Sequence, residues 1–115
     1  MKRDLTVYLD DILESIERIR EYADGMELDD FKANGQTQDA VLRRLEIIGE
    51  AVKNIPETVR ARHPKLPWKE IAGMRDVLIH AYFGVNMARV WKTIHEDLAE
   101  LETTITKIKK TKYIR

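Results

Sequence analysis

Residues 5–23, LTVYLDDILESIERIREYA, carry the pattern that decides the fold. Their apolar side chains recur three and four positions apart, the spacing that puts them on one face of an α-helix. Asp4 can cap the start of this helix, and Gly25 can end it. The stretch therefore predicts a long amphipathic helix that must bury one face. The apolar positions are Leu5, Tyr8, Leu9, Ile12, Ile16, Ile19 and Ala23.

Two further stretches, residues 41–55 and 87–108, show the same periodicity. Thr37 or Gln36 can cap the first of these helices, and Asn86 can cap the second. The second stretch keeps its three-and-four alternation over about three heptads, which predicts one long helix. The apolar positions are Val41, Leu42, Leu45, Ile48, Ala51, Val52 and Ile55 in the first stretch, and Met87, Val90, Trp91, Ile94, Leu98, Leu101, Ile105 and Ile108 in the second.

Short connections separate these helices. MELDDFKANG has room for one turn around residues 28–31, closed by Gly35, and ETVRARH after Pro56 predicts a short helix. The two prolines of HPKLPW force an extended connection and fix where the next helix begins. No stretch alternates with period two, so no strand is expected. We therefore expect an all-α fold, an antiparallel up-and-down bundle of four to five helices in a single domain, residues 1–115.

Composition excludes several classes of function. Twenty basic and twenty acidic side chains cancel, which argues against the strongly cationic surface of a protein that grips long nucleic acid. No apolar run approaches the roughly 20 residues of a membrane span, and the chain opens without a secretory signal, so a cytoplasmic protein is expected. Cysteine is absent, and His63, His80 and His95 lack close ligand spacing. We expect neither a metal site nor a cofactor.

Residues 68–84, WKEIAGMRDVLIHAYFG, hold the constellation that packing alone explains least. On a helix, Arg75 and His80 would lie at the two margins of the outward arc, with Ile79 and Phe83 between them. A solvated face would not need those two apolar side chains. The pattern therefore indicates that another part of the chain, or another chain, covers this surface.

An arginine beside a histidine suits phosphate chemistry. Guanidinium stabilises charge that builds on a phosphoryl group, and histidine moves a proton near neutral pH. RNA supplies its own nucleophile, so Arg75 and His80 could promote attack by a 2′-hydroxyl without a metal, and a two-fold dimer would bring two copies of the pair into one cleft. Alternatively, Arg75 and Asp76 satisfy helix termini and His80 is a hydrogen-bonded histidine at the bundle end. Spacing alone favours this structural interpretation.

Other polar and aromatic positions have structural interpretations as well. The C-terminal KIKKTKYIR complements a helix dipole or, alternatively, forms a phosphate-attracting arm for RNA. Trp68 and Trp91 are predicted as core anchors rather than base-stacking platforms. His63 and His95 are predicted as structural or solvated.

The octapeptide RDVLIHAY, residues 75–82, resembles the signature of the HEPN superfamily, and of its HepT-like toxins in particular, in which an arginine is followed at short spacing by His-x-Tyr. LRRLEIIGEAVKNIP, HPKLPWKEIAGMRD and HAYFGVN also resemble this family. The resemblance implies a homodimeric, metal-independent endoribonuclease, the toxin half of a two-gene toxin–antitoxin module. Arg75 and His80 match the catalytic pair. Asp76 stands where many relatives carry asparagine; its carboxylate could orient Arg75 or His80, but it also adds negative charge near the substrate phosphate.

The resemblance also implies a partner. In such modules a small MntA-like nucleotidyltransferase antitoxin transfers AMP from ATP onto the motif tyrosine, which Tyr82 matches. Adenylated Tyr82 would set a phosphate and an adenine beside Arg75 and so occupy the cleft. Two other functions remain open: a non-catalytic helical, nucleotide-binding subunit of a nucleotidyltransferase, and a purely structural interaction module.

Overall fold

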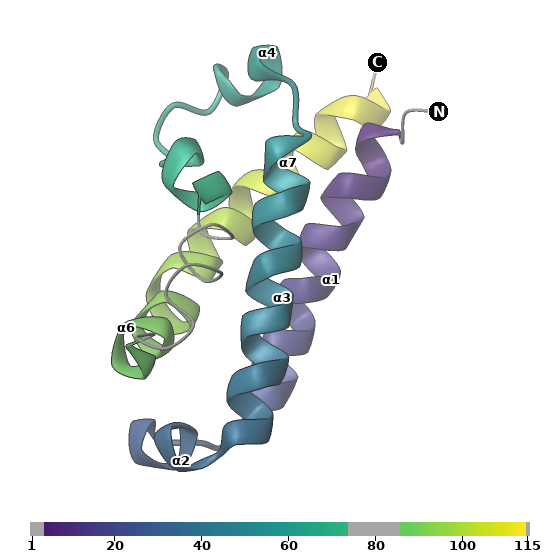
Figure 1. Ribbon diagram of the computed structural model, residues 1–115. Helices are drawn as coiled ribbons and strands as arrows, with labels where there is room; N and C mark the ends of the chain where they lie inside the picture. Colours follow the sequence, from purple (N-terminus) through teal and green to yellow (C-terminus); the bar gives the residue numbers. More distant parts are fainter. Residues whose placement is uncertain (1–3, 74–85, 115) are drawn as a thin grey trace.

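A computed structural model describes residues 4–73 and 86–114 of the chain, and every regular element in these two ranges is helical (Figure 1). This confirms the predicted all-α bundle. Residues 68–73 are helical as well. The other elements are α1 (Leu5–Ala23), α2 (Leu28–Ala33), α3 (Gly35–Lys53), α4 (Glu57–Arg60), α6 (Met87–Lys92), the π-helical turn η1 (Thr93–Asp97) and α7 (Leu98–Ile114).

The three long helices make the framework of the bundle. Both α3 and α7 run antiparallel to α1 and pack against it (Figure 1). Their apolar stripes meet in one core, and burying each such side chain contributes about 1.5–3 kcal/mol. The predicted stripes are therefore confirmed as the core-facing sides. The buried positions are Leu9, Ile12, Ile16 and Ile19 of α1, Val41, Leu45, Ile48 and Val52 of α3, and Leu98, Leu101, Ile105 and Ile108 of α7.

Two ion pairs join α1 to α7 on the surface. In the first pair, Nη1 of Arg20 donates to both carboxylate oxygens of Glu102, at 2.8 and 2.9 Å. In the second pair, Lys109 Nζ lies 2.6 Å from an Asp10 oxygen. Exposed pairs of this kind contribute less than about 1 kcal/mol each. Their main effect is to fix the register of α1 against α7, because one pair lies toward the C-terminal end of α1 and the other toward its N-terminal end.

The ends of α1 and α3 follow from local capping. The Asp4 carboxylate accepts a hydrogen bond from the Thr6 backbone N–H at 3.1 Å, and Gly25 has a φ of +75°, so both predicted ends of α1 are confirmed. The predicted start of α3 is wrong. Asn34 caps it, accepting from the Thr37 N–H at 2.9 Å, so α3 begins at Gly35. An asparagine two or three residues upstream is the stronger cap, and glycine tolerates the first helical position.

Two short elements also differ from expectation. The helix predicted from ETVRARH is only one turn long, since α4 ends at Arg60 and turns follow. The long C-terminal helix is interrupted by η1, where the backbone widens by one residue per turn. At this turn His95 Nδ1 lies 2.9 Å from the Trp91 carbonyl oxygen, so a side chain supplies a partner for that carbonyl.

Within the two described ranges, no helix combines the length and the apolar character that crossing a membrane requires.

Candidate active site

The predicted site residues Arg75, Asp76, His80 and Tyr82 fall in residues 74–85, outside the described part of the chain, as do Ile79 and Phe83. The structure therefore defines the site through the two segments that border it. These are the helical residues 68–73, which precede the site, and α6, which follows it. Both segments are held by contacts with the core.

Trp68 fixes the segment that leads into the site. Its side chain is 8% exposed, and its indole Nε1–H donates a hydrogen bond to the carbonyl oxygen of His63 at 2.8 Å. The Trp68 backbone N–H donates to the Leu66 carbonyl at 2.9 Å, and Leu66 is itself buried. The prediction that Trp68 is a core anchor is confirmed. Buried tryptophan usually finds such a partner for its N–H, and here the partner lies in the connection just before the helix.

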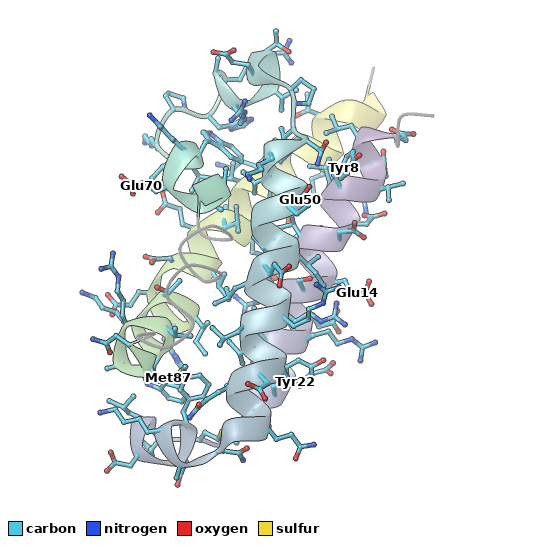
Figure 2. The ribbon with its side chains drawn as sticks, in the orientation of Figure 1. Tyr8, Glu14, Tyr22, Glu50, Glu70 and Met87 are labelled. Atoms are coloured by element: carbon cyan, nitrogen blue, oxygen red, sulfur yellow. The ribbon has the colours of Figure 1, made fainter. Side chains whose placement is uncertain are left out.

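Asn86 fixes the segment that leaves the site. Its side-chain oxygen accepts hydrogen bonds from the backbone N–H groups of Ala88 at 3.0 Å and Arg89 at 3.2 Å, which confirms the predicted cap. The next residue, Met87, packs against the core (labelled in Figure 2), and Val90 is buried. The start of α6 is therefore determined by the two hydrogen bonds to the Asn86 side chain and by the packing of Met87 and Val90.

Aromatic contacts also hold α6. The Trp91 ring contacts Phe31 of α2 and His95 of η1, with ring-centroid distances of 5.3 and 4.1 Å and tilted ring planes. Trp91 is half-buried, so it contributes to packing as predicted, while His95 is exposed. Sequence reasoning missed Phe31, which is fully buried. The available signal was a lone aromatic residue in a short connection rich in acidic residues.

The described surface includes an acidic groove. Along α1 and α7 it is lined by five carboxylates and one cation, Arg20, while Arg18 pairs with Glu14 and Glu21 and Arg20 pairs with Glu102. The excess of carboxylates disfavours a polyanionic ligand there. The acidic residues of the groove are Glu14, Glu17, Glu21, Asp24 and Glu102, of which Glu14 is labelled in Figure 2. In the C-terminal basic run, Lys109 is paired with Asp10 and the helix continues to Ile114. A role of that run in RNA binding stays a prediction.

Comparison with known proteins identifies the family. The model of the Ribonuclease HepT-like family matches residues 12–108. The chain is 50% identical to a probable ribonuclease HepT of Thermococcus cleftensis over 96% of this chain and 100% of that protein. It is also 50% identical to a putative RNase of Caldanaerobacter subterraneus over 88% of this chain and 90% of that protein.

A further relative has a composite name. The chain is 48% identical to a gamma-glutamylcyclotransferase and putative RNase of Methanocaldococcus jannaschii, over 94% of this chain and 49% of that protein. No solved structure matches. The family match covers both anchored borders and the whole stretch between them. Together these comparisons confirm the resemblance and the enzyme class that it implied: the chain belongs to the HepT-like ribonuclease family.

Proposed function

We propose that this chain is a metal-independent endoribonuclease in which Arg75 and His80 form the catalytic pair. The match of the family model to residues 12–108 carries this proposal, because it spans the entire Arg–His–x–Tyr motif. Similarity to proteins named as ribonucleases over nearly their whole length adds support.

The chemistry needs a proton acceptor, a proton donor and a cation at the phosphate. His80 takes the proton of the ribose 2′-hydroxyl, whose oxygen forms a bond to the adjacent phosphorus while the bond from phosphorus to the 5′-oxygen breaks. Arg75 stabilises the charge on the non-bridging oxygens. A second proton donor protonates the leaving 5′-oxygen. In a homodimer His80 of the second copy fills that role, and Asp76 orients Arg75 or His80.

The described structure supports this proposal through the contacts that anchor the two borders of the stretch. Both borders of the stretch are attached to the core, through Trp68 and Leu66 on one side and through Asn86 and Val90 on the other. Preorganised catalytic groups require a frame of this kind, since they must hold their geometry without reorganising during the reaction.

The direct test is RNA cleavage by purified protein in EDTA. Arg75→Ala and His80→Ala should each lose at least about 100-fold in cleavage rate, and the product should end in a 2′,3′-cyclic phosphate. DNA of the same sequence should stay intact. Arg18→Ala serves as the matched control, because this side chain is exposed on α1, remote in sequence from the motif. Equal cleavage by wild type and the two motif variants would remove the catalytic assignment.

We also propose that the enzyme is a cytoplasmic toxin, one domain over residues 1–115, neutralised by a nucleotidyltransferase that adds AMP to Tyr82. After co-expression with such a partner, intact mass should show added AMP, and Tyr82→Phe should abolish the addition. Tyr22→Phe is the matched control. RNA that stays intact with the unmodified protein, together with partner-dependent labelling of Tyr82, would favour the alternative of a non-catalytic subunit.

A further inference from the structure

Residues 58–69, TVRARHPKLPWK, form the most cationic segment near the candidate site. They contain Arg60, Arg62, Lys65 and Lys69 and no carboxylate, whereas the whole chain has a net charge of zero. We name these residues the basic loop. They run from α4 into the helix that begins at residue 68. The segment therefore concentrates positive charge on a chain whose remaining residues carry more acidic than basic side chains.

The backbone of the basic loop is held in place by hydrogen bonds and by burial. The His63 N–H donates to the Arg60 carbonyl at 3.0 Å, and the His63 carbonyl accepts from the Trp68 indole at 2.8 Å. Leu66 and Trp68 are buried in the core, and Pro67 restricts the backbone between them. Cations on a fixed backbone lose less conformational entropy on binding than cations on a flexible tail.

The cations of the basic loop differ from those of the framework in their partners. Arg62, Lys65 and Lys69 are exposed, and Arg60 is half-buried with an enclosed Nε that has no hydrogen-bond acceptor. Among the described residues, none of the four makes an ion pair. By contrast, carboxylates of the framework neutralise Arg18, Arg20, Arg43 and Lys109. The charge of the basic loop is therefore available to an anionic ligand.

The basic loop is also close in sequence to Arg75 of the candidate catalytic pair. Lys69 precedes Arg75 by six residues, so their Cα atoms lie within about 20 Å of each other whatever path the chain takes. Figure 1 shows the segment after α4 leading directly into the helix that borders the site. The exposed acid on that helix is Glu70, labelled in Figure 2.

We infer that the basic loop is a second RNA contact, which holds backbone phosphates of single-stranded RNA a few nucleotides from the bond that is cut. This inference rests on the proposed ribonuclease function. Phosphate contacts position a strand and carry no direct sequence information, so the basic loop sets affinity and strand direction and leaves base preference to the site itself. The basic loop should therefore raise the affinity only for RNA longer than a dinucleotide.

Salt-dependent binding tests this inference. In a His80→Ala background, which keeps RNA intact, the triple variant Arg62→Gln/Lys65→Gln/Lys69→Gln should bind a labelled single strand of about 15 nucleotides at least about 10-fold more weakly. The slope of log Kd against log salt should fall by about 2, since each single-strand phosphate contact contributes about 0.7. Fluorescence anisotropy measures both quantities, and circular dichroism checks folding.

A matched control removes the same charge elsewhere. Arg18→Gln/Lys32→Gln/Arg43→Gln, three exposed cations of α1, α2 and α3, should change Kd less than about 3-fold and leave the slope nearly unchanged. Unchanged affinity in the basic-loop variant, or an equal loss in the control, would overturn the inference. The inference would also be overturned if the basic-loop variant kept its RNA binding but lost binding of a protein partner, because the basic loop would then be a protein-docking surface.

Cleavage separates this inference from the proposed function. With His80 restored, the basic-loop variant should show about 10-fold higher KM on long RNA with little change in kcat, and unchanged kcat/KM on a dinucleotide. An equal loss on both substrates contradicts a distant phosphate contact. If the wild type cuts no RNA but the basic loop still governs salt-dependent binding, the nuclease assignment fails and the RNA contact stands.

Discussion

The framework and the borders of the site are stabilised in different ways. In the framework, α1 and α3 have 19 residues each and α7 has 17, and their stability comes from continuous buried stripes. At the borders, α6 and the described helix at 68–73 have six residues each. A helix as short as 68–73 is not stable alone in water, and α6 continues through η1 into α7. A cap and two tryptophans help to determine where these two segments lie. The comparison teaches that folding and site position can be perturbed separately.

The largest expected effect is in the framework. Ile48 is fully buried in α3, so Ile48→Ala should lower the free energy of unfolding by about 3 kcal/mol through lost burial and a residual cavity. Urea unfolding followed by circular dichroism measures it. Val7→Ala on α1, where the side chain is 37% exposed, should cost less than about 0.5 kcal/mol. Equal costs at the two positions would contradict the core described above.

Trp68→Phe should have the second-largest effect on the free energy of unfolding. It keeps an aromatic ring but leaves the His63 carbonyl without the indole donor, at a cost of about 1–2 kcal/mol. Amide exchange should rise most in residues 63–68, and RNA cleavage should fall more than the stability loss explains. Trp91→Phe is the control, because the Trp91 indole makes no hydrogen bond to the described residues. A uniform rise in exchange across α1 and α3 would show that Trp68 belongs energetically to the framework.

Asn86→Ala should cost about 1 kcal/mol, since the N–H groups of Ala88 and Arg89 lose their acceptor. Asn86→Asp should restore most of that stability. Hydrogen exchange at these two amides is the sensitive measurement. Protection that stays at the wild-type level in Asn86→Ala would mean that packing of Met87 and Val90 alone determines the start of α6.

The smallest expected effect is an increase in the free energy of unfolding, caused by a substitution in the framework. Ser15 is fully buried in α1, and its Oγ has no hydrogen-bond partner among the described residues. Ser15→Ala removes this unmet polar atom and should raise the free energy of unfolding by about 0.5–1 kcal/mol. Thermal unfolding measures the change. A lower midpoint would show that the hydroxyl stabilises the helix after all.

Sequence reasoning succeeded where the determining interactions are local. The stripes of α1, α3 and α7 follow from helical periodicity, and the Asp4 and Asn86 caps lie beside the helices that they start. It failed at the start of α3, where several polar residues compete as caps and Asn34 prevails. It also gave no sign of η1, because three-and-four spacing is compatible with one widened turn.

For the candidate site, sequence supplies the chemistry and the structure supplies its support. The Arg75–His80 motif was predicted from its resemblance to a family signature, since spacing alone favoured a structural interpretation, whereas the contact of Phe31 with Trp91 joins positions far apart in the chain. Periodicity carries no information on such pairs. The basic loop was overlooked for a different reason: its cations are spread between prolines and apolar anchors, whereas the C-terminal lysines stand together.

The widened turn at Thr93–Asp97 accommodates one extra residue in the C-terminal helix. Deleting one residue there would convert it to an ordinary α-helical turn and leave α6 in nearly the same orientation about the helix axis, because the turn still spans about 360°. A one-residue deletion within α7 would instead rotate everything on its N-terminal side by about 100°, so that Val90 would leave the core and Asn86 would move with it. One-residue deletions should therefore be tolerated better at the widened turn than within α7, and substitutions at the exposed Glu96 and Asp97 should be tolerated as well.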